Sequence, residues 1–139
     1  MKAEEVNQLL ESLHKIWNIE ELVSFNEFNI QDRLQNLQYQ IILYSEEFIR
    51  VKAELNRLII LRDRLSGKKY DQLRFKSDKN LTKYEIEKYY LVNDPDIIKI
   101  NNTIAKQTII VEFFETCIKA LDKQNWAIKL FLDDRKYLG

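Results

Sequence analysis

The stretch from Asn29 to Gly67 reads NIQDRLQNLQYQIILYSEEFIRVKAELNRLIILRDRLSG and contains no Gly or Pro before its last residue. Its apolar residues recur at spacings of three and four and fit one heptad register, with Leu34, Ile41, Phe48 and Leu55 at a, and Leu37, Tyr44, Val51, Leu58 and Leu65 at d. Such a sustained 3.5-residue repeat keeps one apolar stripe facing a partner helix. The pattern therefore predicts a single long helix, capped at its start by Asn29 and ended by Gly67.

Two features of this helix indicate more than a two-helix core. The segment Leu58–Leu61 is apolar on every side of the helix, which predicts burial on every side and therefore contacts between subunits. Arg62 takes an a position, so the apolar seam should open there to water or to a ligand. Arg50, Arg57 and Arg64 lie seven residues apart on one face, a spacing equally typical of the solvated face of a bundle helix.

Shorter elements are predicted on both sides of this helix. Residues 3–16 carry apolar residues on one face and predict an amphipathic first helix. After Gly67 the apolar periodicity fails and cations alternate with aromatic rings, which predicts an exposed basic loop over about residues 67–82. Thr82 and Glu85 then have the spacing of a capping box, so a short helix should run from there to about Leu91.

A second long helix is predicted in the C-terminal third. Asp94 is a suitable N-cap, and Pro95 is favoured at the first helical position. The heptad pattern then places Ile97, Ile104, Val111 and Ile118 at a, and Ile100, Phe114 and Leu121 at d, with Gln107 as the one polar exception. Residues 123–125 interrupt this pattern, so we expect a separate last helix from Trp126.

Several single residues have predicted packing roles. Trp17, Phe25 and Phe28 are expected to pack against neighbouring helices, the alternative being an exposed docking patch for a partner. The only histidine, His14, is expected to lie at the surface or a helix end. The only cysteine, Cys117, excludes an intrachain disulfide, fits a reducing cytoplasm, and should be a small apolar core residue.

Length and composition indicate one helical domain, residues 1–139. Hydrophobic residues make up 45% of the chain, and only 2 Gly and 1 Pro interrupt it, which favours long helices. The net charge is zero but unevenly distributed: residues 1–61 have 6 Lys/Arg and 10 Asp/Glu, or −4, whereas residues 62–90 have 9 and 5, or +4. No apolar run approaches the ~20 residues that cross a bilayer, so no membrane association is expected.

The sequence contains no recognisable catalytic motif. A Gly-rich phosphate loop, a Gly-x-Ser-x-Gly elbow and Cys/His metal spacings are all missing from it. We therefore expect a protein that is not an enzyme, with no cofactor and no metal site.

The segment from Arg62 to Tyr90 has a composition typical of single-strand binding. Cations can follow a phosphate backbone while aromatic rings stack on unpaired bases, without sequence preference. The candidate cations are Arg50, Arg57, Arg62, Arg64, Lys68, Lys69, Arg74 and Lys76, and the candidate stacking rings are Tyr70, Phe75 and Tyr84. The alternative is a solvated segment whose aromatic residues fold back onto the bundle.

The region from about residue 30 to 138 resembles the UvsY family, the recombination mediators of T-even-type tailed bacteriophages. The most specific similarity lies in the last third of the chain. The matching motifs are Asn93–Ile100 (NDPDIIKI), Phe114–Leu121 (FETCIKAL), Trp126–Lys129 (WAIK), Asp134-Arg135, Leu43-Tyr44-Ser45 and Ser66-Gly67.

This resemblance implies an all-α fold, an elongated helical bundle with two long helices that assembles into a homo-oligomeric ring of about six or seven subunits. It also implies single-stranded DNA binding, and help to a RecA-like phage recombinase in displacing the phage single-strand binding protein and forming its filament. The processes implied are DNA recombination, repair and replication in the cytoplasm of the infected bacterial host.

The resemblance also suggests where DNA binds. The family's basic DNA contacts near the end of the long helix match Arg62 and Arg64 when two residues are deleted before Ser66-Gly67, and match Ile59 and Leu61 without that deletion. The competing interpretation of the whole chain is a non-catalytic helical scaffold or adaptor whose basic segment binds an acidic protein partner.

Overall fold

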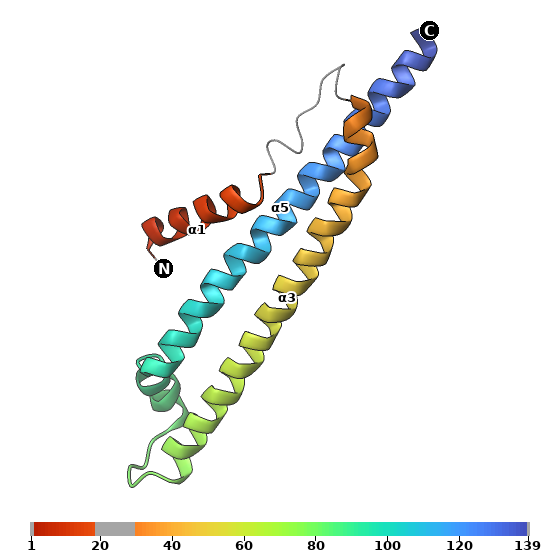
Figure 1. The fold of residues 1–139 in the computed structure, drawn as a ribbon. Helices are drawn as coiled ribbons and strands as arrows, with labels where there is room; N and C mark the ends of the chain where they lie inside the picture. The colour runs from red at the N-terminus through yellow and green to blue at the C-terminus, as the bar shows by residue number, and fades with distance from the viewer. Residues whose placement is uncertain (1, 19–29, 139) are drawn as a thin grey trace. The chain divides into compact units, whose positions relative to one another are not determined.

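The computed structural model describes residues 2–18 and 30–138, with side chains described to residue 135. Within these residues all regular structure is helical (Figure 1): α1 (Ala3–Ile16), α3 (Ile30–Phe75), α4 (Lys83–Glu85), the π-helix η1 (Ile86–Leu91) and α5 (Pro95–Leu138). The prediction of an all-α fold with two long helices is confirmed. The predicted cap at Asn29 and the packing of Phe25 and Phe28 lie outside the described residues.

Helix α3 is longer than the sequence predicts. It passes through Gly67 and ends at Phe75, so the predicted C-cap at Gly67 and the predicted loop over residues 67–82 are wrong. The connection that is not helical covers residues 76–82. An interior Gly costs a helix about 1 kcal/mol, and the helix nevertheless continues past it, with Lys69 bonded to Asp94 and Asp96 at the start of α5. The Ser77 hydroxyl then donates to the Leu73 carbonyl at 2.7 Å, which satisfies one carbonyl of the last turn.

The start of α5 is as predicted, but its course is not. The Asp94 carboxylate accepts hydrogen bonds from the backbone N–H groups of Asp96 at 2.9 Å and Ile97 at 3.1 Å, which confirms the N-cap. The helix then continues through residues 123–125 to Leu138, so the predicted break is wrong. Gln124 is only 4% exposed and occupies the core side of an unbroken helix. Lys and Gln are good helix formers, and no Gly or Pro opposes them there.

The capping box that begins α4 is confirmed in a modified form. The Thr82 hydroxyl oxygen accepts from the Glu85 N–H at 3.2 Å, and the hydroxyl donates to the Glu85 carboxylate at 3.0 Å. After one turn the hydrogen bonding changes to the wider π pattern of η1. Such turns are rare and are frequently found at functional sites.

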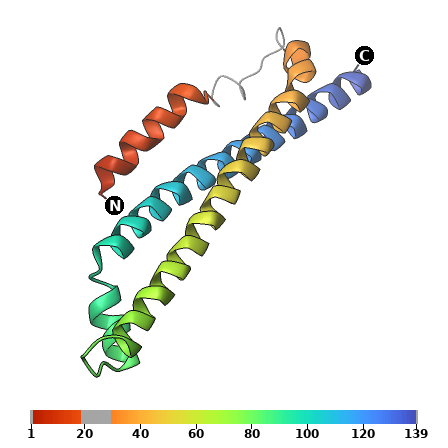
Figure 2. The same cartoon turned by 60° about the horizontal axis from the view of Figure 1, so that its bottom comes forward.

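The chain forms two compact units, and both long helices contribute to each. One unit is residues 52–108, which hold the end of α3, α4, η1 and the start of α5. The other has residues 2–51 and 109–139, of which the structure describes 2–18, 30–51 and 109–138. Within each unit the segments of α3 and α5 run antiparallel and side by side (Figures 1 and 2).

An aromatic cluster forms the core of the unit that contains α1. Phe114 of α5 is 2% exposed and Tyr44 of α3 is 1% exposed. The ring of Trp17, just after α1, makes edge-to-face contacts with both, at centroid distances of 5.1 Å and 5.0 Å. His14 makes a similar contact with Phe113 at 5.2 Å. These contacts confirm the predicted packing of Trp17, and they attach α1 to α5. His14 is exposed in the last turn of α1, which confirms its predicted place.

The heptad pattern correctly marks the buried side of α3, with one refinement. The d positions Leu37, Tyr44, Val51 and Leu58 are buried, whereas the d position Leu65 and the a positions are only partly covered. In the unit of residues 52–108, Leu58, Ile86 and Ile97 are buried. Ile60 and Leu61 are 51% and 39% exposed, so the chain by itself does not cover all sides of the Leu58–Leu61 segment.

The buried Tyr44 and Cys117 make an alkaline loss of stability an expected result. Burial raises the pKa of the Tyr44 phenol to about 12 and that of the Cys117 thiol to about 11. Because the native state holds both protons more tightly than the unfolded state, stability is complete below the ordinary pKa values and falls as pH rises through them. The midpoint of urea unfolding should therefore decrease from about pH 9 upward. It should decrease less steeply in Cys117→Ala, and parallel curves for parent and variant would contradict this.

Candidate nucleic-acid interface

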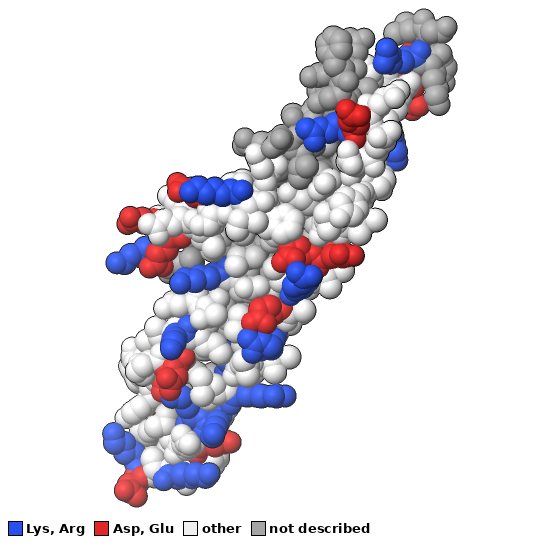
Figure 3. Space-filling model, in the orientation of Figure 1, with Lys and Arg blue, Asp and Glu red and all other residues white. Residues whose placement is uncertain are grey.

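The basic surface lies in the unit of residues 52–108. Residues 62–90 carry 9 Lys/Arg against 5 Asp/Glu, and they span the end of α3, the connection over 76–82, α4 and η1. Figure 3 shows basic side chains spaced over this unit, in the lower part of the view, with acidic side chains between them. Which cations can reach a ligand therefore depends on which of them already have carboxylate partners.

Two of the predicted cations are paired with glutamates on their own helix. Arg57 donates two hydrogen bonds to Glu54, at 2.8 Å and 2.5 Å, and this pairing lowers the pKa of the Glu54 carboxyl. Arg50, which belongs to the other unit, donates to Glu47 at 2.7 Å. Both pairs are three residues apart, a spacing visible in the sequence that the heptad interpretation of the arginine face overlooked.

Lys69 bridges α3 to the start of α5. Its ammonium group lies 2.7 Å from the Asp94 carboxylate and 2.9 Å from that of Asp96. The hydrogen bonds that Lys69 donates to Asp94 and to Asp96 raise the pKa of Lys69, and the first of them lowers the pKa of the Asp94 carboxyl. The Lys69 side chain is only 21% exposed. This bridge joins residues about 25 positions apart and holds α3 helical beyond Gly67.

The other predicted cations of α3 are more available. Among the described residues Arg62 has an ion pair only with its neighbour Asp63, at 3.3 Å, and its side chain is 34% exposed. Arg64, Lys68 and Lys76 are exposed, and within the described residues the structure gives none of them an ion pair. Arg64 and Lys68 are four residues apart on one helix and therefore share a face.

Arg74 brings two of the predicted stacking rings together at the end of α3. Its guanidinium lies 5.9 Å from the ring centroids of both Tyr70 and Phe75, and it donates to the Tyr70 hydroxyl at 3.0 Å. Phe75 is 72% exposed. The cluster therefore combines an exposed ring with a cation that no carboxylate of the described residues neutralises.

Tyr84 belongs to a second cluster that sequence reasoning missed in part. The Lys88 ammonium lies 5.0 Å from the Tyr84 ring centroid and 5.7 Å from that of Tyr89, and it donates to the Tyr84 hydroxyl. The two rings meet edge to face at 6.2 Å. In an α-helix, residues five apart point about 140° away from each other. The wider turn of η1 brings Tyr84 and Tyr89 to one side of the helix. From the sequence, only the contact between Tyr84 and Lys88, which are four residues apart, could have been predicted.

The structure thus places seven of the eight predicted cations and all three predicted rings in one unit, with Arg50 in the other. In the part of the chain that the structure describes, no three His, Cys, Asp or Glu side chains are grouped so that they could hold a metal ion. None of the described helices is both long and apolar enough to cross a membrane.

Comparison with known proteins shows which fold carries this surface. No family model matches the chain, and no curated protein matches it by sequence. Crystal structures of the bacteriophage T4 recombination mediator protein UvsY do match. In lattice type IV the TM-score is 0.74 at 18% identity, over 94% of this chain and 98% of UvsY. The chain has the fold of UvsY.

Two further crystal forms of UvsY give the same result. Lattice type I matches with a TM-score of 0.74 at 17% identity, over 95% of this chain and 99% of UvsY. Lattice type II matches with a TM-score of 0.73 at 17% identity, over 99% of this chain and 97% of UvsY. The UvsY fold therefore extends over almost the whole chain, including the basic unit.

Proposed function

We propose that this protein is a recombination mediator that binds single-stranded DNA, in keeping with the resemblance of its C-terminal motifs to the UvsY family. In this role it helps a RecA-like recombinase displace a single-strand binding protein and form its filament, without catalysis, in the cytoplasm of a phage-infected bacterium. The observation that carries the proposal is the combination of unpaired cations with exposed rings in one unit of a UvsY fold.

The proposed phosphate contacts are the cations that retain their charge at the surface. Arg64, Lys68 and Lys76 have no carboxylate partner among the described residues, Arg62 has only its exposed neighbour, and Arg74 contacts rings. Phe75, the most exposed ring of this group, and Tyr70 are the adjoining surfaces for bases. We assign Lys69, Arg50 and Arg57 to the ion pairs described above, because releasing them for DNA would leave carboxylates facing the phosphates.

A ring of subunits would increase the number of phosphate contacts that one strand can make. Each basic unit offers only a few phosphate contacts, but linked copies convert later contacts into intramolecular ones and raise the overall affinity 10²–10⁴-fold as a rough range. The exposed Ile60 and Leu61 next to buried Leu58 provide an apolar surface for such an assembly. We therefore propose a homo-oligomer whose subunit contacts include the Leu58–Leu61 segment.

Ile60→Asp is expected to dissociate this assembly while leaving each chain folded. Ile60 is 51% exposed in the single chain, so the carboxylate stays solvated there, whereas burial at a subunit contact would cost several kcal/mol. Light scattering should show a lower mass at unchanged helicity by circular dichroism. Ile49→Asp, at a 67% exposed position on the same helix, is the matched control. A monomeric parent at micromolar concentration would refute the assembly proposal.

Fluorescence anisotropy with labelled oligo(dT) tests DNA binding, and an assay of recombinase loading tests mediation. A mediator should bind the strand at moderate salt and should speed filament formation on strands already covered by single-strand binding protein. A helical scaffold for an acidic protein should bind oligo(dT) weakly and leave filament formation unchanged. That second result would replace the mediator with the scaffold interpretation.

A further inference from the structure

We propose that Tyr84 and Tyr89, with Lys88 beside them, form a stacking site for unpaired bases that makes the interface select single strands over duplex DNA. This inference rests on the proposed function, since it concerns how the same basic unit recognises its ligand. It adds a base-contacting site on η1 to the phosphate contacts on α3.

Phosphate contacts alone do not favour single strands. Duplex DNA presents about one charge per 1.7 Å of helix axis. When the logarithm of affinity is plotted against the logarithm of salt concentration, each neutralised phosphate contributes a slope of about −0.9 for duplex DNA and about −0.7 for single strands. A purely basic surface would therefore prefer duplex DNA. Selection of single strands requires contact with base faces, which are exposed only when the bases are unpaired.

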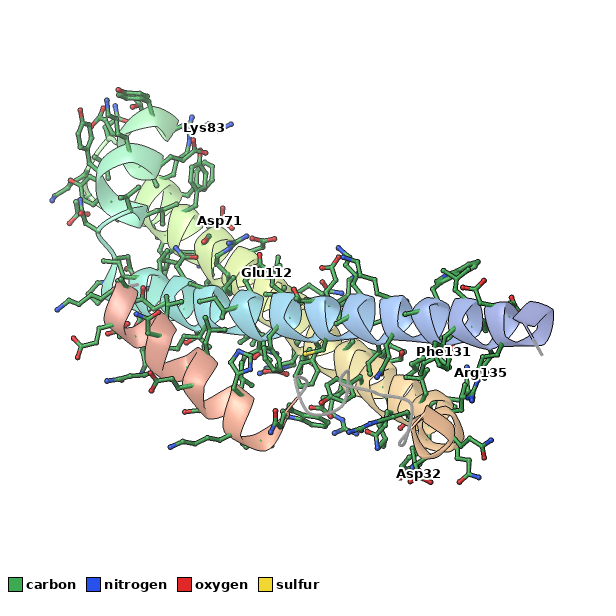
Figure 4. All side chains as sticks on the ribbon, turned by 90° about the horizontal axis from the view of Figure 1, so that it is seen from above. Asp32, Asp71, Lys83, Glu112, Phe131 and Arg135 are labelled. Carbon is green, nitrogen blue, oxygen red and sulfur yellow. The ribbon has the colours of Figure 1, made fainter. Side chains whose placement is uncertain are left out.

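The two tyrosines have the exposure that such contact needs. Tyr84 is 60% exposed and Tyr89 is 55% exposed, although rings of this size are usually largely covered in a folded protein. Figure 4 shows side chains around α4 and η1, near the label of Lys83, that point outward from the helix. The two rings are therefore available to a ligand in the chain as it stands.

Lys88 places a charge beside the pair. Its ammonium group lies 5.0 Å and 5.7 Å from the two ring centroids and donates to the Tyr84 hydroxyl, and the rings meet 6.2 Å apart at an interplanar angle of 86°. Because the rings meet edge to face, base faces can stack only on the open sides of the pair. No carboxylate is bonded to Lys88 within the described residues, so its charge remains available to the phosphate beside a stacked base.

The test compares three ligands: oligo(dT), an abasic strand of the same length, and duplex DNA. In the double variant Tyr84→Leu with Tyr89→Leu, affinity for oligo(dT) should fall about 10-fold or more. Affinity for the abasic strand and the duplex should stay within about twofold, because the phosphate contacts are intact. Tyr89→Phe should keep oligo(dT) affinity, since stacking uses the ring and the hydroxyl that Lys88 bonds is that of Tyr84. Tyr39→Leu, at an exposed tyrosine of the other unit, is the matched control.

Photocrosslinking of the unmodified protein to a strand containing 5-bromouracil provides a test without substitutions. Adducts should be found on the peptide that contains Tyr84 and Tyr89. Adducts found only on other peptides would overturn the stacking site while leaving single-strand binding in place. So would a leucine variant that loses the same factor of affinity for oligo(dT) and for the abasic strand. Failure of the parent protein to bind any single strand would overturn the proposed function and the stacking site together.

Discussion

Simultaneous replacement of Arg64, Lys68 and Lys76 by alanine should flatten the salt dependence of single-strand binding by roughly 2.1 on a log–log scale for each subunit that engages the strand. Each phosphate contact to a single strand contributes a slope of about 0.7, and these three cations have no carboxylate partner among the described residues. Between about 50 and 200 mM salt the parent should therefore lose about 18-fold more affinity per engaged subunit than the variant. Anisotropy at four salt concentrations measures both slopes.

The matched control for this variant is Arg50→Ala, Arg57→Ala and Lys119→Ala, which removes the same total charge. All three control cations are paired with glutamates on their own helices, Lys119 with Glu115 at 3.4 Å. Its slope should remain close to that of the parent. Equal slopes in all three proteins, with the oligomer intact, would remove the phosphate contacts from the end of α3.

Phe114→Ala should lower the free energy of unfolding by about 3–5 kcal/mol. Phe114 is 2% exposed and contacts the rings of Trp17, Tyr44 and Phe113 at centroid distances of 5.1, 6.1 and 5.3 Å. Its removal leaves a cavity where α1, α3 and α5 meet, and the surrounding rings cannot fill it without losing their own contacts. Urea unfolding at one fixed protein concentration measures the loss, because assembly would make apparent stability depend on concentration.

Trp126→Ala is the control for that measurement. Trp126 lies on the same helix, but it is 67% exposed, so its truncation should change the unfolding free energy by less than about 0.5 kcal/mol. A comparable loss in both variants would show that burial in the aromatic cluster does not determine the stability of this unit.

Which cations and rings of the candidate site can contact DNA could be predicted only in part from the sequence. The excess of cations over residues 62–90 and the presence of rings among them are properties of the chain, and the pairs Glu54/Arg57 and Glu47/Arg50 can be recognised from their spacing. The pairing of Lys69 with Asp94 and Asp96 could not be predicted, because these partners lie about 25 residues away in the sequence. The contribution of Tyr89 also required the structure, since only the π-turn brings it to the side of Tyr84.

The sequence by itself determined the helical class, the buried row of α3 and the caps at Thr82 and Asp94. Each of these follows from residues within one or two turns of each other, through the spacing of apolar side chains or a hydroxyl or carboxylate beside free N–H groups. Only the tertiary structure decided that α3 continues past Gly67 and that α5 continues past residue 123. At Gly67 a local preference to stop costs about 1 kcal/mol, and the Lys69 bridge to residues distant in the sequence opposes it. In α5 the burial of Gln124 and Ile128 shows that residues 123–125 lie within a packed helix, which the apolar pattern did not reveal.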